Sequence, residues 1–206
     1  MRIISGSFKG KKILEPKNKK TRPLKDLTKE SIFNIINHSN KFKIDFSNSY
    51  ILDLFSGVGS FGIECLSRGV EKVIFIENYK GVIPILKKNL FSLKTVENYK
   101  IIEKNVYNKD IFSKLNNNFD IIFLDPPYKD KNLENLLNEI DNIAVRGNAV
   151  RAMGNRRCSV DGVAASKPFL IDHGCGVGIQ LPHLNNLDVT HLRSGDAIVF
   201  VVFAEQ

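Results

Sequence analysis

The residues Asp125-Pro126-Pro127-Tyr128 follow directly on an apolar stretch and combine a carboxylate, a rigid carbonyl and an aromatic ring. Two consecutive prolines remove two backbone donors and fix the path of the chain as it leaves a strand. An aromatic amine is a poor nucleophile, because its lone pair is delocalised into the ring, until acceptors hold its N–H groups. Asp125 and the Pro126 carbonyl are such acceptors, and Tyr128 can stack on an extruded base. The motif therefore predicts a catalytic site, with all four residues in it, for transfer chemistry on a base amine.

A glycine-rich loop, Ser56-Gly57-Val58-Gly59, separates an apolar stretch from a helical one, and Gly62 follows. Gly57 and Gly59 allow the backbone to approach a ligand closely, and Gly62 lets the helix pack on the strand. Alone, such a pattern is weak evidence, because dinucleotide-binding domains share it. Its context is stronger, because Asp53 lies three residues before Ser56 and can reach a cationic or hydroxyl-bearing cofactor. We predict a cofactor-binding loop that includes Phe55.

Glu77 ends the next apolar stretch, about 20 residues after the first glycine of the loop, which is the spacing of a ribose-binding acid. A carboxylate there accepts both ribose hydroxyls and repels a 2′-phosphate. Together with the glycine loop, Glu77 is predicted to bind the ribose of an adenosine-containing cofactor.

These residues need a scaffold that brings them to one edge, and the chain alternates strand and helix from Tyr50 onward. Strands are predicted at 50–55, 72–77, 99–103 and 119–124, with helices from Ser60, over 80–93, after 103 and after Lys131. An earlier helix, capped by Asp26 or Thr28, ends near 37–40. Consecutive apolar β-branched residues followed by helices are typical of a doubly wound, mainly parallel α/β sheet. Its ligand lies beyond the carboxyl ends of the strands, where the loop, Glu77, Asn105 and Asp125 all fall.

The composition changes abruptly near Asn142. Residues 1–142 carry 24 basic and 17 acidic residues, a net +7 of the total +8, while residues 143–206 carry 6 and 5. We predict a basic extension (1–45), a catalytic core (46–142) and an atypical segment (143–206). That segment is a possible completion of the sheet, a fusion or a frame-shifted tail. Within it, strands are predicted at 169–172 and 197–203, and the imitation of a second cofactor loop at 169–178 is read as coincidence.

Positive charge concentrates in the extension, where lysines alternate with apolar residues at strand-like spacing. This pattern predicts a small basic hairpin that faces a nucleic acid, although a solvated surface arm is the alternative. The predicted RNA-binding residues are Lys9, Lys11, Lys12, Lys19, Lys20 and Arg22.

Three scattered cysteines predict neither a disulfide framework nor a zinc site, and the chain lacks a run of about 18 apolar residues that would span a membrane. We therefore expect a cytoplasmic protein, without a metal and without a membrane partner. We also expect a monomer.

Residues 1–141 resemble the RsmD-like family of bacterial small-subunit (16S) ribosomal RNA guanine-N(2) methyltransferases, a Rossmann-like class I branch of the S-adenosylmethionine-dependent enzymes. The N-terminal block and the combination of Ser67-Arg68-Gly69 with the Asp-Pro-Pro-Tyr motif are particular to this family. The matching segments are Arg2–Gly6, Phe8–Gly10, Thr21–Pro23, Asp26, Lys29-Glu30, Phe33-Asn34, Leu52–Gly59, Gly62–Glu64, Leu66–Gly69, Phe75–Glu77, Asn89-Leu90 and Phe119–Tyr128.

The resemblance implies methyl transfer from S-adenosylmethionine to the exocyclic amine of a guanine in small-subunit rRNA, free or in an assembling subunit. It implies that Asp53 and the 56–59 backbone hold the methionyl part, Glu77 the ribose, and Asn105-Val106 the adenine side. Two departures are Leu24, where the family has Thr, and residues 143–206, which do not match the family's last strands. Two alternatives stay open: a DNA adenine or cytosine amino-methyltransferase, and an inactive RNA-binding or ribosome-assembly protein.

Overall fold

A seven-stranded sheet with the order β3-β2-β1-β4-β7-β6-β5 organises the protein. In this computed structural model the described residues are 1–16, 24–38, 44–108, 110–115, 119–127, 132–144, 177–179, 187–194 and 197–204. The strands are β1 (Tyr50–Leu54), β2 (Lys72–Ile76), β3 (Tyr99–Ile102), β4 (Ile121–Leu124), β5 (Val177–Ile179), β6 (Leu187–Ser194) and β7 (Ala197–Ala204). Neighbours from β3 to β7 are parallel, and β6 and β5 add antiparallel pairs.

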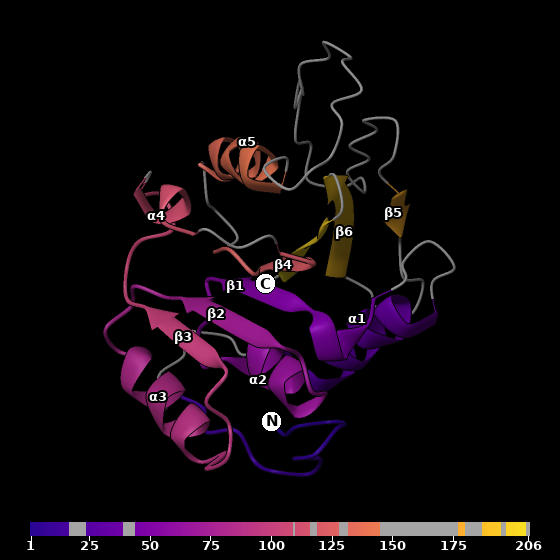
Figure 1. Cartoon of the computed structure of the whole chain (residues 1–206), viewed down its shortest axis with the longest axis vertical. Coiled ribbons are helices and arrows are strands. Elements are labelled where there is room, and N and C mark those ends of the chain that lie inside the picture. Colours follow the sequence, from indigo (N-terminus) through magenta and orange to yellow (C-terminus); the bar gives the residue numbers. More distant parts are fainter. Residues whose placement is uncertain are drawn as a thin grey trace.

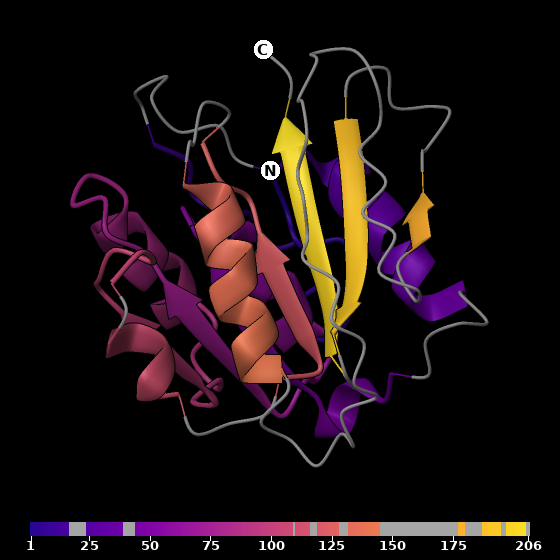
Figure 2. The same ribbon diagram turned by 90° about the horizontal axis from the view of Figure 1, so that it is seen from above.

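Helices cover both faces of the parallel part (Figure 1, Figure 2). The helices are α1 (Asp26–His38), α2 (Ser60–Ser67), α3 (Ile83–Phe91), α4 (Asp110–Ser113) and α5 (Leu133–Ala144), with a 3-10 turn, η1, at Phe46–Asn48. The first three lie on one face with the N-terminal segment, and α4 and α5 lie on the other. This is the doubly wound α/β arrangement that the sequence predicts.

Alternate residues of each strand feed two separate cores. In β1, Ile51 packs in the core under α1, α2 and α3, whereas Leu52 and Leu54 pack in the core under α4 and α5. A strand that is buried on both faces must be apolar at nearly every position, which explains why the strands read as continuous apolar runs.

The starts of two elements and the cap of a third differ from the prediction, each for a local reason. Helix α3 begins at Ile83 rather than near 80, because Pro84 fits only the first turn and a turn over Tyr79–Val82 precedes it. Strand β4 begins at Ile121 rather than 119, because the Asp120 carboxylate accepts a hydrogen bond from the Tyr50 backbone N–H at 2.8 Å. Thr28 is buried inside the first turn of α1 and is therefore not its cap.

The C-terminal strands extend the sheet beyond β4. Strand β7 matches the stretch predicted at 197–203 and pairs with β4 in parallel register, Ile121 opposite Ile198. Strands β5 and β6 lie where the sequence shows no firm periodicity. The strand predicted at 169–172 lies outside the described residues.

The N-terminal residues form the predicted hairpin, with an antiparallel bridge between Arg2 and Lys12. It lies across α2 and α3 (Figure 1), and Ile3 and Ile13 are buried in the core beneath it. Within the described part of the chain, no helix is long and apolar enough to cross a bilayer.

Candidate active site

The glycine loop takes a strained path between β1 and α2. Phe55, Gly57 and Gly59 all have positive φ, at 57°, 56° and 83°. Residues other than glycine rarely adopt this backbone conformation. The Ser56 hydroxyl donates to the Asp53 and Ile76 carbonyls at 2.6 and 3.2 Å, which ties the loop to β1 and β2. The Ser56 backbone adds to this, because its N–H donates to the Ile76 carbonyl at 3.1 Å and its carbonyl accepts from the Gly59 N–H at 2.8 Å, so both the side chain and the backbone of Ser56 hold the loop in shape.

Gly59 and Gly62 are required by packing. A Cβ on Gly59 would lie 2.5 Å from Leu86 of α3, and one on Gly62 would lie 2.3 Å from the Phe75 ring of β2. Helix α2 thus lies closer to the sheet than any side chain there would permit. Gly59 is also the N-cap of α2. Because glycine has no side chain, no capping carboxylate or hydroxyl at this position accepts a hydrogen bond from the first turn of the helix.

Asp53 is buried beneath the loop, with 1% of its surface exposed. Its Oδ2 accepts a hydrogen bond from the Gly62 N–H at 3.0 Å. Burial raises the pKa of Asp53 well above its ordinary value; the Gly62 hydrogen bond opposes this shift, and the charges of Asp125 and Glu77 add to it. The direct contact with a methionyl group that the resemblance implies stays a prediction, because Asp53 is not among the residues that line the pocket.

Glu77 clamps two loops together. Its Oε2 accepts from the Gly57 N–H at 2.7 Å, and its Oε1 accepts from the Asn78 and Tyr79 N–H groups, both at 2.8 Å. Each carboxylate oxygen has further acceptor capacity, so the same group can also receive hydroxyl hydrogens. The sequence predicts the position of Glu77 but not this clamp.

Asp125 follows β4 and is partly buried, while Pro126 is buried and Pro127 is exposed. Burial raises the pKa of Asp125 to about 7. At neutral pH this carboxyl is therefore divided between its protonated and ionised forms. Tyr128 lies outside the described residues.

One open pocket is lined both by residues predicted to bind the cofactor and by a residue of the predicted catalytic motif. It encloses about 450 Å³ of empty space, part of it at the open mouth. The structure thus brings together residues that are separated by up to 72 positions in the chain, from 55 to 127. The lining residues are Phe55, Ile76, Glu77, Asn78, Asn105, Val106, Tyr107 and Pro127.

Three of these lining residues were missed by the sequence reasoning: Ile76, Asn78 and Tyr107. Ile76 and Asn78 flank Glu77, and Tyr107 follows Asn105-Val106, so adjacency to a predicted residue is the only signal. The ring centroids of Tyr107 and Phe55 are 6.0 Å apart, so the two form one aromatic wall.

Three carboxyl groups lie near one another in this region, since the charges of Asp125 and Glu77 both help to raise the pKa of the buried Asp53. Carboxylates that raise each other's pKa are stabilised in their ionised form by a nearby cation. The donor set thus fits a positively charged ligand that also carries hydroxyl groups. Among the described residues no cluster of three or more metal-ligating side chains is found.

The structure describes three of the six predicted RNA-binding residues, and these three differ in exposure. Lys9 and Lys12 are exposed, whereas Lys11 is half-buried and its ammonium donates to the Ser92 carbonyl at the end of α3. Lys19, Lys20 and Arg22 lie outside the described residues.

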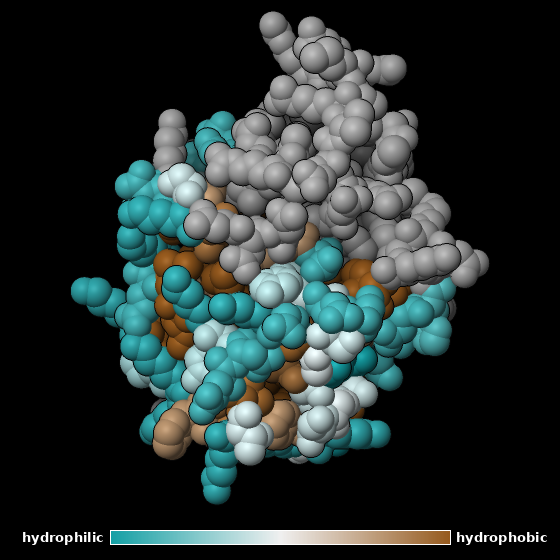
Figure 3. All heavy atoms as spheres, in the orientation of Figure 1, coloured by the Kyte–Doolittle hydropathy of each residue, from teal (hydrophilic) through white to brown (hydrophobic). Residues whose placement is uncertain are grey.

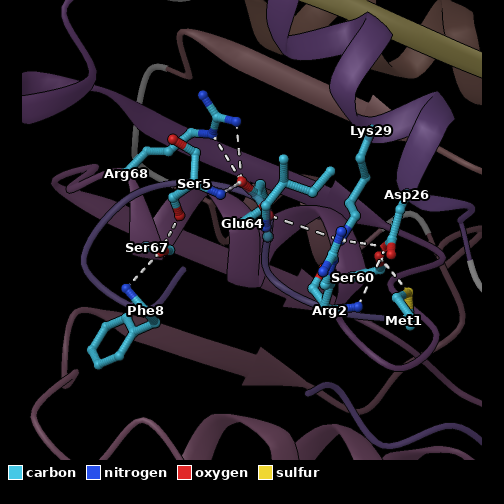
Figure 4. A network of polar contacts seen from close by, with 12 residues as sticks. Met1, Arg2, Ser5, Phe8, Asp26, Lys29, Ser60, Glu64, Ser67 and Arg68 are labelled. Atoms are coloured by element: carbon cyan, nitrogen blue, oxygen red, sulfur yellow. Dashed lines mark hydrogen bonds and ion pairs between the residues drawn. The ribbon is translucent and has the colours of Figure 1, made fainter. Parts of the chain in front are cut away.

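A buried charge network holds the hairpin on α2 (Figure 4). The Glu64 carboxylate accepts from the Ile4 and Ser5 N–H groups at 2.7 and 2.9 Å and pairs with Arg68 at 3.1 Å. The fully buried Lys29 ammonium lies 3.8 Å from Glu64 and donates to the Arg2 carbonyl at 2.7 Å. The spacing of these residues carries no motif of its own, which is why their role was not predicted.

A second link connects the hairpin to the glycine loop. The buried Asn89 side chain accepts from the Leu14 N–H at 2.8 Å and donates to the Leu14 and Val58 carbonyls at 3.1 and 3.0 Å. Leu14 belongs to the hairpin and Val58 to the loop, so one side chain of α3 fixes both.

Comparison with known proteins identifies the chain's relatives. A family model described as Conserved hypothetical protein 95 matches residues 1–153. The chain belongs to this family. As a member, it is 37% identical to ribosomal RNA small subunit methyltransferase D of Haemophilus influenzae, over 62% of this chain and 64% of that protein. It is 30% identical to the Escherichia coli protein of the same name, over 68% and 67%. The resemblance predicted from the sequence is therefore confirmed.

Solved structures agree. The structure of an Escherichia coli protein described as a methyltransferase matches with a TM-score of 0.57 and 30% identity, over 69% of this chain and 72% of that one. A Haemophilus influenzae methylase matches with a TM-score of 0.50 and 34% identity, over 68% and 72%. The Rossmann-like class I methyltransferase fold is confirmed, and these relatives imply S-adenosylmethionine as the methyl donor. The match to the Haemophilus influenzae rRNA methyltransferase spans less than two thirds of that protein's length.

Proposed function

We propose that this protein transfers a methyl group from S-adenosylmethionine to the exocyclic N(2) amine of a guanine in small-subunit rRNA. The observation that carries the proposal is the pocket, where four predicted cofactor-binding residues meet Pro127 of the Asp-Pro-Pro motif. The names of the relatives, which are small-subunit rRNA methyltransferases, support the substrate class.

The cofactor would be held by groups that are already in place. Glu77 would accept the ribose hydroxyls with the capacity that its three backbone hydrogen bonds leave, and Asn105 and Val106 would flank the adenine. The 56–59 backbone would contact the methionyl part, with Asp53 fixing the start of α2 through Gly62. When bound, S-adenosylmethionine supplies a methyl group activated by its positively charged sulfur.

The chain's own contribution is to orient the base amine and exclude water. The ionised Asp125 carboxylate and the Pro126 carbonyl would accept the two N–H hydrogens of the amine, which restores nucleophilic character to its nitrogen. The two prolines keep these acceptors fixed. Stacking of the base on Tyr128 stays a prediction.

The RNA would meet the protein through its basic N-terminal extension, which the Glu64 network and Asn89 hold against α2 and α3. Because the hairpin is attached to the glycine loop through Asn89, its position relative to the pocket is fixed. We also propose that the protein is a monomer in solution.

The deciding experiment uses methyl-labelled S-adenosylmethionine with small ribosomal subunits, naked small-subunit rRNA and double-stranded DNA as separate substrates. We expect label in rRNA, recovered after nuclease digestion as N(2)-methylguanosine. Label in another nucleoside of rRNA would refute the guanine-N(2) assignment alone. Label only in DNA would establish the amino-methyltransferase alternative, and tight RNA binding without label would establish the inactive RNA-binding one.

A further inference from the structure

The end of α3 presents an aromatic ring to solvent. Phe91 is 83% exposed, the highest value among the large hydrophobic side chains that are exposed in the described part of the chain. Its neighbours Leu90 and Leu93 are buried in the core, so the helix and the turn after it are anchored while Phe91 faces outward. A single exposed apolar side chain is common on protein surfaces, so the meaning of Phe91 depends on the residues near it.

Two lysine-rich segments lie beside the end of α3. Residues 87–94 and 9–12 contain six lysines and no acidic residue. The two segments form one surface, because the Lys11 ammonium donates to the carbonyl of Ser92, the residue after Phe91. Lys87 is paired with Glu103, which leaves four exposed lysines in the two segments. We call Phe91, Lys9, Lys12, Lys88 and Lys94 the hairpin–α3 surface.

This surface lies away from the pocket. The pocket is lined by residues that follow the ends of β1, β2, β3 and β4, whereas α3 runs back from that edge and ends before β3 begins. In the lower part of Figure 3, over α3 and the hairpin, the molecule is mainly hydrophilic with small isolated hydrophobic areas. A ligand at this surface is therefore separate from the base in the pocket.

We propose that the hairpin–α3 surface binds a single-stranded stretch of the RNA substrate outside the target nucleotide. Its lysines neutralise phosphates, and Phe91 stacks on a base, which is the combination that single-stranded nucleic acids require. A protein partner would need a contiguous apolar patch, and a lone ring among four lysines does not provide one. The inference rests on the proposed function and extends the RNA-binding surface of the hairpin onto the end of α3.

The test measures the affinity of the full-length protein for a fluorescent single-stranded fragment of small-subunit rRNA by anisotropy, without cofactor, over a range of salt concentrations. Phe91→Ala should weaken binding by about tenfold, because base stacking on one aromatic side chain is removed. Phe91→Tyr is the matched control, since it keeps an aromatic ring at the same exposed position. It should leave the affinity unchanged.

The charge component is read from the salt dependence. Lys12→Gln/Lys88→Gln/Lys94→Asn should reduce the slope of log affinity against log salt by about two, because each lysine that neutralises a phosphate of a single strand contributes roughly 0.7 to that slope. Asparagine is chosen at position 94 because Lys94 has a φ of 56°, which asparagine tolerates. Lys114→Gln, on an exposed residue after α4, is the control and should change the slope by no more than the contribution of one lysine.

Unchanged affinity in Phe91→Ala together with an unchanged slope in the triple variant would overturn the inference. That outcome would leave the proposed function intact if the wild-type protein still methylates rRNA. Failure of the wild type to methylate rRNA would refute the proposed function by a separate readout, since binding here is measured without cofactor.

Discussion

At the scale of single residues, Asp125 links the geometry of the site to its chemistry. A carboxylate that must accept a hydrogen bond from an amine acts only when ionised, and burial raises the pKa of Asp125 to about 7. The pocket thus contains an acceptor whose state changes within the physiological range. Of the other two carboxyl groups of the site, Glu77 accepts the three backbone hydrogen bonds of the clamp, whereas burial raises the pKa of Asp53 well above its ordinary value and so favours its neutral form.

The first prediction follows from that pKa. For methyl transfer, kcat/KM should rise about tenfold per pH unit below pH 7 and level off above it, because only ionised Asp125 accepts the amine hydrogens. The measurement is a pH profile of kcat/KM for RNA. In kcat, measured at saturating cofactor, the midpoint should move to lower pH, since a bound cation favours the ionised carboxylate. Asp125→Asn should abolish the rising limb while cofactor affinity is retained, and equal loss of both would assign Asp125 a structural role.

The same shift predicts an effect on stability with the opposite sign. The pKa of Asp125 is higher in the folded protein than its ordinary value of 3.8, so the folded state binds more protons between pH 4 and 7. The contribution of Asp125 to stability is therefore greatest below pH 4 and is lost as pH rises through about 7. Asp125→Asn should raise the melting temperature relative to wild type at pH 8 and change it little at pH 4. A uniform shift at both pH values would contradict this assignment.

Glu77 is the second residue whose role is testable alone. Glu77→Gln keeps one oxygen but removes the charge and one acceptor, so the clamp on Gly57, Asn78 and Tyr79 is weakened along with the ribose site. Affinity for S-adenosylmethionine, measured by calorimetry, should fall by about 10- to 100-fold, the range for a hydrogen bond to a charged group. Glu103→Gln, on an exposed acid beyond β3, is the control, and comparable losses in both variants would contradict a ribose-binding role.

At the scale of elements, the parts that sequence predicts are those with local signals. The alternating strands and helices, the glycine loop and the strand end at Glu77 are carried by residue spacing. The attachment of the hairpin is not, because Glu64 and Lys29 are 35 positions apart and meet only in the folded chain. Strands β5 and β6 escaped prediction for a related reason, since they are defined by pairing, β6 with β7 and β5 with β6, and not by their own periodicity.

The Glu64 network gives an element-scale prediction. Glu64→Gln leaves the buried Lys29 ammonium without its inner carboxylate, and it weakens the bonds to Ile4 and Ser5. The free energy of unfolding should fall by about 3–5 kcal/mol in urea titrations. Lys29→Met should cost less, because Glu64 keeps its two backbone donors and Arg68. Since burial lowers the pKa of Lys29, the cost of Glu64→Gln should shrink at high pH, where Lys29 becomes neutral. A larger cost for Lys29→Met would show that Lys29, not Glu64, anchors the hairpin.

At the scale of the whole molecule, the charge and the fold divide the chain at different places. The net +7 belongs to residues 1–142, and the family match ends at residue 153. The sheet nevertheless continues, because β7 pairs with β4 along Ile121–Leu124. The segment with the foreign composition therefore supports the strand that ends at Leu124, directly before Asp125. The division into 1–45, 46–142 and 143–206 stays a prediction, and it is based on the change in composition and not on the pairing of the strands.

Truncation after Ala144 tests which of these divisions matters for function. Without β7, the backbone of β4 is left as an edge and loses its hydrogen bonds on one side, and the Asp-Pro-Pro segment loses the support of a central strand. The truncated protein should melt at a lower temperature than the full chain and lose the rise in melting temperature that S-adenosylmethionine causes. The matched control, Val201→Ala in the full chain, changes one β7 side chain while keeping the strand, and should retain the cofactor-induced rise. If the truncated protein melts like the full chain and keeps that rise, residues 145–206 are an appendage, and β4 is stable as an edge.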